Sequence, residues 1–526
     1  MLDLLVVGVL IVDGTGGTAF PGAAGVRGDR IAWIGRDGVP APPAARTIEG
    51  AGRILAPGFV DVHNHSDLSP FVLPAMPSTI RQGVTTVVVG NCGSSPWPLS
   101  GWEEGVQLAY GDPSTRPRPT WTSWDDYLDA IDEARPAANI ATLVGHGALR
   151  REALGLARRA PDGDELRAMR RMASGAVEAG AFGMSSGLIY VPGMYAATDE
   201  LVALAECVAA AGGLYTSHIR GEGEHLFRAV DEAIEIGRRA GLPAHVSHLK
   251  CETALVAGRA GELLARFHTD DDVTGDQYPY AAWCSSLSSL LPPWAPVRDL
   301  EAIVRDREGR ERLRRAVERG EPDFQSSIAG VGWDAIVVVG TREARWNGRD
   351  VASIAEELGF EPFAAMVALL REDADTSCIG HAMDEADVRT ILADPGVFVA
   401  SDASATAPDG PGGTLPVHPR EYGTFPRALA LARDEGLLPL EAVIRKMTSL
   451  PAERFGLRDR GLVAEGGFAD LVLFDPVAVR DTATFAAPHA FPAGIDLVLV
   501  NGRVAWDRAA PGGGERAGRA LRRGSG

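Results

Sequence analysis

The chain has 526 residues, of which 45% are hydrophobic and 23% are charged. This is the composition of an ordinary folded protein with a large core, and it excludes a disordered or fibrous chain. The 70 acidic residues outnumber the 51 basic ones and give a net charge of −19, which argues against a nucleic-acid partner or an anionic membrane surface. The charge says nothing about a small-molecule substrate or about the oligomeric state.

The five cysteines are an odd number spread over a long chain. No disulfide framework follows from them, and a reducing compartment is favoured. The first residues, MLDLLVVGVLIVDGTGG, are apolar, but Asp3 stands where a secretion signal would be basic, and Asp13 interrupts the run before a membrane-spanning length. We therefore expect a strand and a turn here, and a cytoplasmic protein without membrane contact.

The pattern of strands and helices predicts a barrel. Short β-type runs fill residues 1–57 and predict a small β-layer. Over residues 58–455, short apolar strands alternate with helical stretches, which is typical of β/α units around a parallel sheet. There are eight strand candidates, which is the number of strands in a closed (β/α)8 barrel, although residues 377–383 are a ninth candidate that weakens this agreement. The eight are 58–65, 85–92, 140–146, 181–186, 214–218, 243–250, 272–280 and 396–402.

The remaining segments predict three additions to the barrel. Residues 281–395 are too many for a simple βα connection, so we expect an inserted subdomain over the barrel mouth. β-type runs return at 456–508, and we expect them to pair with residues 1–57 as a β-sandwich. Residues 509–526, rich in Gly and Arg, predict a disordered tail. The expected fold is thus α/β: a TIM-like (β/α)8 barrel with a flanking β-sandwich formed from both chain ends and an inserted subdomain.

Two histidines, His63 and His65, close the first predicted strand in the run DVHNH. Since strand side chains alternate between faces, both rings point the same way, at the end of the barrel where active sites are built. Taken alone, the pair is equally well explained as two loop histidines.

Donor side chains recur at the ends of four other predicted strands. Nitrogen, thiolate and carboxylate donors in this shared position are the ligand set of a divalent metal such as zinc. The alternative, polar residues at the barrel rim, explains each residue singly but not the shared position. The four are Cys92, His218, His248 and Asp402.

At this point the sequence resembles the amidohydrolase superfamily and, within it, the N-acyl-D-amino-acid deacylase (D-aminoacylase) family. The resemblance covers nearly the whole chain. It depends on an ordered series of motifs: PGFVDVHNHSD, QGVTTVVVGNCG, LVGHGALR, GMSSGLIY, TSHIRGEGE, HVSHLKC, YPY followed by LLPPW, SDAS followed by HPREYGTFPR, and ADLVLFDP with VLVNGR. It implies a (β/α)8 barrel with a β-sandwich and a zinc-dependent hydrolase of linear amides.

The resemblance also implies the roles of the metal ligands. Many amidohydrolases bridge two metals with a carboxylated lysine on the fourth strand, but neither lysine of this chain, Lys250 or Lys446, lies there. Cys92 takes the bridging role instead, and His218 and His248 complete one tight zinc site. His63 and His65 belong to a second, weaker site. The alternative for Cys92 is a buried apolar cysteine.

Asp402 and three further residues complete the expected site. A carboxylate beside the metal can take a proton from water and return it to the leaving nitrogen, and the resemblance gives Asp402 this general acid/base role. The alternative is a helix N-cap in the run SDAS. Lys250 points to the same side as His248 if the strand continues. The resemblance implies that Lys250, Tyr280 and Arg420 bind the α-carboxylate of the substrate, although Tyr280 is equally a packed aromatic residue.

The expected reaction is hydrolysis of the amide bond of an N-acyl-D-amino acid to a carboxylate and a free D-amino acid. One alternative is a cyclic amidase of the dihydropyrimidinase type, which would normally need the bridging lysine. Others are an amidohydrolase acting on a different amide, dipeptide or ring amine, and a non-catalytic barrel used for binding. Trp283 and Cys284, which follow YPY, leave the preference for acyl group and side chain open.

Overall fold

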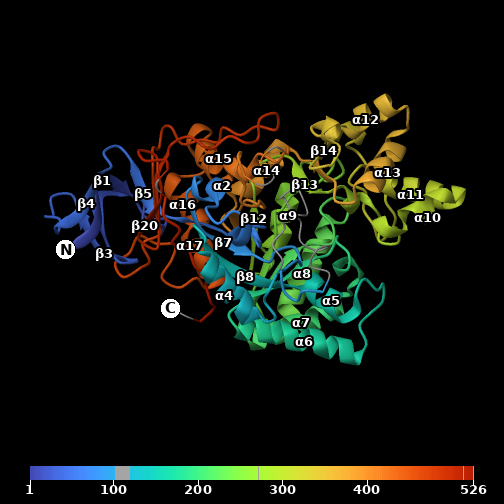
Figure 1. The fold of residues 1–526 in the computed structure, drawn as a ribbon, viewed down its shortest axis with the longest axis horizontal. Coiled ribbons are helices and arrows are strands. Elements are labelled where there is room, and N and C mark those ends of the chain that lie inside the picture. The colour runs from blue at the N-terminus through green and yellow to red at the C-terminus, as the bar shows by residue number, and fades with distance from the viewer. Residues whose placement is uncertain (101–118, 271, 411–412, 414, 513, 525–526) are drawn as a thin grey trace.

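A computed structural model describes residues 1–100, 119–270, 272–410, 413, 415–512 and 514–524. Three parts lie in a row along the long axis of the molecule (Figure 1). A β-layer containing the first strands lies at one end, the β/α part lies in the middle, and a smaller group of helices and strands that includes α10–α13 lies at the other end.

The middle part is a barrel of eight parallel strands, as the sequence predicts. Strands β7 and β8 are buried along their whole lengths, as expected for a parallel sheet covered on both faces. The sheet order is β6 (Phe59–Asp61), β7 (Val84–Val89), β8 (Asn139–Gly145), β9 (Gly183–Gly187), β10 (Leu214–His218), β11 (Ala244–Val246), β12 (Val273–Gln277) and β17 (Val397–Val399).

The barrel closes just beyond the ends of its first and last strands. The backbone N–H of Asp402 donates to the carbonyl of His63 at 2.8 Å, and that of His65 donates to the carbonyl of Ala403, also at 2.8 Å. These bonds join the segment after β17 to the segment after β6. Two predicted site segments, DVHNH and SDAS, therefore lie side by side at the carboxyl end of the barrel.

Helices surround the barrel and have conventional starts. Asp162 caps α6 in a capping box with Glu165, and Asp384 caps α14. The helices outside the insert are α1 (Ser69–Val72), α2 (Pro77–Ile80), α4 (Trp124–Ala134), α5 (His146–Leu154), α6 (Gly163–Glu178), α7 (Thr198–Ala210), α8 (Leu226–Ala240), α9 (Ala260–Phe267), α14 (Glu385–Ala393), α15 (Arg420–Asp434), α16 (Leu440–Met447) and α17 (Ser449–Phe455).

Both chain ends build the flanking β-layer, which confirms the predicted pairing. Strand β18 pairs antiparallel with β5 from the start of the chain and with β19 from its end. The layer encloses its own apolar core, which includes Val6, Leu55 and Leu499. Its strands are β1 (Leu2–Ile11), β2 (Phe20–Arg27), β3 (Arg30–Arg36), β4 (Ala44–Glu49), β5 (Ile54–Pro57), β18 (Leu471–Phe474), β19 (Ile495–Val500) and β20 (Arg503–Asp507).

The predicted insert contains a separate antiparallel sheet and a separate core. The ninth strand candidate is β16 (Ser377–Gly380), which pairs with β13 (Trp283–Ser286) and β14 (Ile336–Val339), so it does not belong to the barrel. Helix α14, predicted within the insert, packs on α9 and β17 of the barrel. The other elements of this region are β15 (Arg349–Asp350), α10 (Leu300–Arg305), α11 (Arg307–Arg319), α12 (Val351–Leu358) and α13 (Pro362–Glu372).

The prediction of a disordered tail is wrong for residues 518–523. The backbone N–H of Ile140 donates to Arg519 and the N–H of Leu521 donates to Ile140, at 2.9 and 2.7 Å, so the tail pairs with the start of β8. Arg522 forms ion pairs with Asp129 and Asp132. Composition indicated disorder, but β9 pairs with β8 only from Leu143 onwards, so the start of β8 offered backbone partners to the tail.

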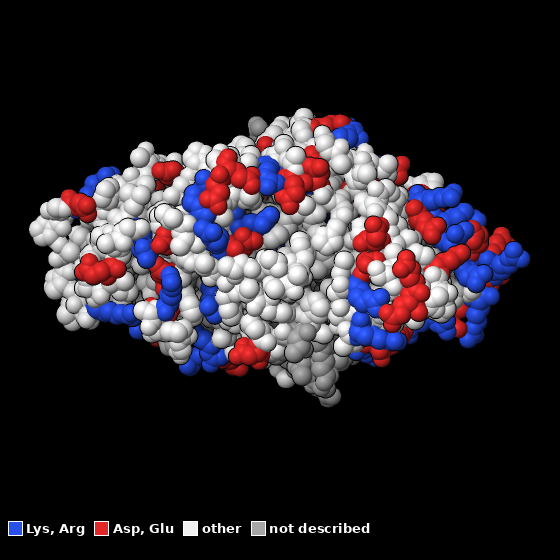
Figure 2. Space-filling model, turned by 90° about the horizontal axis from the view of Figure 1, so that it is seen from above, with Lys and Arg blue, Asp and Glu red and all other residues white. Residues whose placement is uncertain are grey.

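Charged side chains of both signs occur together on the face drawn in Figure 2. Red and blue atoms are mixed towards both ends of the molecule, and a broad uncharged area lies between them. Arg389 and Glu435 are one pair of partly exposed, oppositely charged side chains in contact. Among the described residues, no helix combines the length and apolar character needed to cross a membrane.

Candidate active site

Three predicted metal ligands meet at the carboxyl end of the barrel, just after β7, β10 and β11. The Sγ atom of Cys92 lies 3.5 Å from Nδ1 of His218 and 3.7 Å from Nε2 of His248, and those two nitrogens are 2.9 Å apart. A tetrahedral zinc ion needs sulfur–nitrogen edges of about 3.6 Å and nitrogen–nitrogen edges of about 3.3 Å. The three donor atoms therefore have the spacing of ligands of one zinc ion.

The thiol of Cys92 is poised as a thiolate. Burial by itself would raise its pKa, but the charge of His63 and hydrogen bonds to His218 and His248 hold the pKa of Cys92 well below its usual value. The thiolate is the form that binds metal. This environment supports the ligand role and contradicts the alternative of an inert apolar cysteine.

Backbone strain marks the same residues. Cys92, His248 and Asp402 have φ angles of 52°, 35° and 51°, in the left-handed region that residues other than glycine rarely adopt. Such strain persists only where the surrounding structure enforces it, and it is concentrated at functional sites. Here it turns three side chains from different strand ends towards one point.

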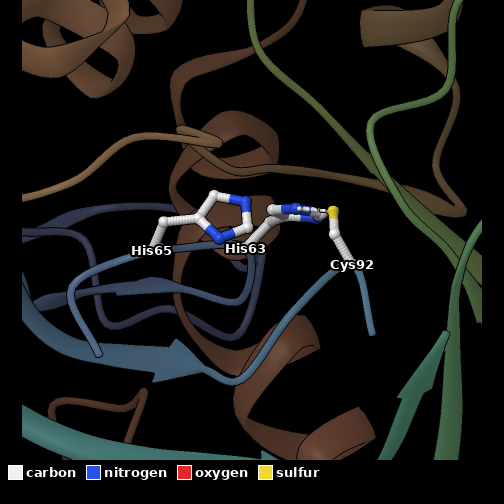
Figure 3. Close-up of side chains that lie close together, drawn as sticks. All are labelled: His63, His65 and Cys92. Carbon is white, nitrogen blue, oxygen red and sulfur yellow. Dashed lines mark hydrogen bonds between the residues drawn. The ribbon is translucent and has the colours of Figure 1, made fainter. Parts of the chain in front are cut away.

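His63 and His65 lie beside this group, with Cys92 between them and the other histidines. Figure 3 shows the rings of His63 and His65 close together, with His63 directed at the sulfur of Cys92. Nε2 of His63 is 3.3 Å from that sulfur, and His63, His65 and Cys92 form a second group of donors within 4.8 Å. Strand β6 ends at Asp61, before both histidines, so strand alternation does not explain why their rings lie together.

Asp402 joins both groups. Its Oδ1 lies 3.1 Å from Nε2 of His65 and 3.4 Å from Nε2 of His63, and His63, His248 and Asp402 form a third possible donor set. The next described helix, α15, begins only at Arg420. The alternative role of Asp402 as a helix N-cap is therefore wrong.

Arg420 is aimed at Asp402. Its Nη1 lies 2.7 Å from Oδ2 of Asp402, while its Nε is buried without a hydrogen-bond partner among the described residues. Burial would raise the pKa of Asp402, but Arg420, followed by His248 and His63, holds it well below its usual value. The site thus contains an ionised carboxylate and a buried guanidinium with an N–H group to spare.

Lys250 lies in the site, whereas Tyr280 points elsewhere. Nζ of Lys250 is 2.8 Å from Nδ1 of His248 and 2.6 Å from Oε1 of Glu222. The hydroxyl of Tyr280 donates to Asp481 at 3.4 Å. Tyr278 instead faces the two cations: its ring centre lies 4.8 Å from the Arg420 guanidinium and 5.7 Å from Lys250 Nζ.

Two acidic residues that sequence reasoning missed hold the histidines. Oε1 of Glu222 lies 2.9 Å from Nδ1 of His248. Asp276 accepts from the backbone N–H of His248 at 2.8 Å, and its Oδ2 lies 3.4 Å from Nδ1 of His63. Glu222 follows the predicted ligand His218 by four residues in TSHIRGEGE, and this closeness was an available signal. Asp276 lies within the predicted strand 272–280, at β12, far in the sequence from every predicted ligand.

Two further histidines of the barrel are not members of the metal donor groups. His245 is buried and shares Asp276 with His63, its Nε2 lying 2.8 Å from Oδ2 of Asp276. His146, which had no predicted role, pairs with Glu200 at 2.9 Å.

The donor set fits a metal by its own geometry and chemistry. Besides the matching distances, Nε2 of His218 is buried without a hydrogen-bond partner among the described residues. Its other ring nitrogen, Nδ1, lies 2.9 Å from Nε2 of His248. A cation bound between Nδ1 of His218 and Nε2 of His248 would replace this contact between two imidazole nitrogens, which stabilises little by itself.

The chain is similar to known proteins over nearly its whole length. Residues 46–505 match the amidohydrolase family. The sequence is 38% identical to an N-acyl-D-glutamate deacylase and 36% identical to a D-aminoacylase, both from Alcaligenes xylosoxydans xylosoxydans; the alignments cover 99% of this chain and 97% and 98% of those relatives.

Among solved structures, an N-acyl-D-glutamate deacylase from Bordetella bronchiseptica is similar at 35% identity and a TM-score of 0.81, with 99% of each chain covered. That enzyme is complexed with zinc and a phosphonate inhibitor that mimics the tetrahedral intermediate of its reaction. The chain described here belongs to the amidohydrolase family, within its group of N-acyl-D-amino-acid deacylases.

Proposed function

We propose that this enzyme uses zinc to hydrolyse the amide bond of N-acyl-D-amino acids, giving a carboxylate and a free D-amino acid. The observation that carries the proposal is the meeting of Cys92, His218 and His248 at metal-ligand spacing beside the ionised Asp402. The relatives named for deacylation of D-glutamate derivatives and for D-aminoacylase activity support the substrate class.

Cys92, His218 and His248 would hold one zinc ion tightly, since a thiolate and two imidazoles suit zinc. His63 and His65, with Cys92 and Asp402 beside them, would hold a second ion more weakly. A bound zinc ion polarises an amide carbonyl and makes water more acidic. The residues around it then have to position the substrate and move the proton.

Asp402 is placed to move the proton. Its carboxylate is buried and ionised, so it can accept a proton from the attacking water and return it to the nitrogen of the leaving D-amino acid. Because the carboxylate that accepts the proton from water is the one that donates it to the leaving nitrogen, one residue serves both halves of the hydrolysis.

Arg420 and Lys250 would bind the α-carboxylate of the substrate. Arginine suits a carboxylate because its N–H groups can form two parallel hydrogen bonds, and Nε of Arg420 has none among the described residues. Tyr278, whose buried hydroxyl also has no described partner, flanks both cations. Tyr280 stays a prediction from resemblance, since its hydroxyl contacts Asp481.

A cyclic amidase of the dihydropyrimidinase type receives no specific support from the site. Lys446, the one lysine besides Lys250, donates to the carbonyls of Leu392 and Asp394 just before β17, at the opposite end of the barrel from the metal ligands.

The test is hydrolysis of matched N-acetyl-D- and N-acetyl-L-amino acids by the purified, zinc-loaded enzyme, with neutral and acidic side chains in each set. We expect D-enantiomers to be preferred by several kcal/mol in kcat/KM, because two fixed points on the substrate leave one direction for the side chain. Equal hydrolysis of N-acetyl-D- and N-acetyl-L-methionine, or undiminished activity on an acyl amine without the carboxylate, would contradict the proposal.

A further inference from the structure

One carboxylate lies beneath both histidines of the proposed tight zinc site. Oε1 of Glu222 is 2.9 Å from Nδ1 of His248, and Oε2 is 4.0 Å from Nε2 of His218. The same Oε1 accepts from Nζ of Lys250 at 2.6 Å. All four side chains are at least nine-tenths buried, so water cannot easily replace Glu222 in these contacts.

The direction of each imidazole fixes where its proton must be. His248 turns Nε2 to the sulfur of Cys92 and Nδ1 to Glu222, whereas His218 turns Nδ1 to the sulfur and Nε2 to Glu222. A neutral imidazole that offers one nitrogen to a metal carries its proton on the other. In both rings, through opposite tautomers, that proton faces Glu222.

We propose that Glu222 is a positioning residue: it holds His248 in its metal-binding tautomer at hydrogen-bond distance, faces the corresponding nitrogen of His218 across 4.0 Å, and ties Lys250 to the same point. The inference takes the ligand and substrate-binding roles from the proposed function. It adds that one buried anion links the metal ligands to a residue that binds the substrate carboxylate. Loss of that anion would therefore weaken zinc binding and carboxylate binding together.

The loop that carries Glu222 is itself held from two sides. The backbone N–H of Glu252 donates to the carbonyl of Glu222 at 2.8 Å. Gln325, from the predicted insert, accepts from the N–H of Gly223 at 3.0 Å and donates to Glu252 at 3.1 Å. A Cβ atom on Gly221 would approach Oε1 of Gln325 to 2.6 Å and Cβ of His225 to 2.8 Å, so a side chain there would displace Gln325 from this contact. The insert thus contributes to the position of Glu222.

The deciding measurement is zinc affinity of the full-length protein, by competition with a chromophoric chelator, for Glu222→Gln and Glu252→Gln. Glutamine at position 222 replaces one carboxylate oxygen with an N–H donor. That donor would face the N–H groups of His248, His218 and Lys250, which need an acceptor. We expect Glu222→Gln to bind zinc roughly 10- to 100-fold more weakly, the usual effect of losing a carboxylate behind a metal-ligating histidine. Glu252→Gln is the control, because it removes a buried carboxylate two residues after Lys250. Glu252 accepts a hydrogen bond from Gln325, and the amide oxygen of glutamine can still accept that bond.

Unchanged zinc affinity in Glu222→Gln would overturn the inference, as would an equal loss in both variants. If Glu222→Gln does not fold, Glu222→Asp decides in its place: it keeps the charge but loses reach, and zinc affinity equal to that of the wild type would overturn the inference. Glu222→Gln should also raise KM for an N-acetyl-D-amino acid. Because zinc affinity needs no substrate, a wild type without deacylase activity would contradict the proposed function alone.

Discussion

The two ends of the barrel contain similar buried polar residues in opposite circumstances. At the carboxyl end, the potential metal ligands Cys92, His218 and Asp402 crowd together. Cys92 and Asp402 have strained backbone, and Nε2 of His218 has no hydrogen-bond partner among the described residues. At the amino end, Asp470 accepts from Arg460, from the side chain of Asn139 and from the backbone of Asn501. The first arrangement is poised for a ligand, whereas the second is complete without one.

In (β/α)8 barrels the two ends of the strands generally have different roles. Loops at the carboxyl ends of the strands can be altered for chemistry, while the other end stabilises the fold. Here the amino end is also closed by the tail, which pairs with β8 through Ile140. We therefore expect substitutions at the carboxyl end to affect metal and turnover, and substitutions at the amino end to affect stability.

The largest effect is expected for Cys92→Ser. Loss of the thiolate should remove the tight zinc ion and reduce kcat by about 10³-fold or more, because several kcal/mol of transition-state stabilisation depend on the metal. Elemental analysis and turnover of the purified variant measure both effects. The control is Cys207→Ser in α7, whose sulfur contacts Arg170 and which should keep zinc and activity. Full zinc content in Cys92→Ser would show that the ligand assignment is wrong.

Asp402→Asn should separate turnover from metal binding. The amide keeps the shape of the side chain but cannot take a proton, so kcat should fall by about 10²- to 10⁴-fold while the tight zinc ion stays. Asp384→Ala provides the contrast: Asp384 is a true N-cap of α14, and its loss should cost about 1 kcal/mol of unfolding free energy without changing kcat. Near-normal turnover in Asp402→Asn would contradict the general acid/base role.

Arg420→Ala should act mainly on substrate binding. A charge-assisted hydrogen bond is worth about 1.5–3 kcal/mol, so KM should rise roughly 10- to 100-fold, with zinc retained and the preference for D-enantiomers reduced. Arg427→Ala, in the same helix, removes a guanidinium that contacts Pro279 and Asp481 and should leave KM unchanged. A similar rise in KM for both variants would mean that α15 was disturbed as a whole.

Much of this contrast between the two ends could be predicted from the sequence, because strand order fixes which residues meet. All eight barrel strands were predicted, and with them the convergence of Cys92, His218 and Asp402 at one end. Each of these residues follows an apolar run whose length and position need no knowledge of the tertiary structure.

The parts that failed depend on turns and on long-range pairing. Alternation could not place Tyr280, because its N–H bonds back to the carbonyl of Tyr278 in a tight turn that ends the strand pattern. Glu222 lies in a glycine-rich loop whose course is fixed by Gln325, about a hundred residues further along the chain. The tail was mispredicted for the same reason, since its backbone partner is Ile140.

The smallest expected effect on activity concerns Lys446 at the amino end. This prediction tests whether the buried amine there is uncharged in the folded protein. Its amine donates to the carbonyls of Leu392 and Asp394. Burial lowers the pKa of Lys446 from 10.5 to about 7, although the charge of Asp394 opposes this. A neutral amine still has two N–H bonds, one for each carbonyl, so the folded protein can keep both hydrogen bonds without a charge.

The sign of the pH dependence follows from these two pKa values. Between about pH 7 and 10 the unfolded chain binds a proton at Lys446 that the folded chain does not, so the unfolding free energy rises with pH by up to about 1.4 kcal/mol per pH unit. Urea unfolding of the wild type and of Lys446→Met at several pH values isolates this contribution, because methionine does not titrate. A difference between the two proteins that stays constant over that range would show that Lys446 is charged in the folded state. In either case the zinc content should not change, because Lys446 lies at the opposite end of the strands from Cys92, His218 and His248.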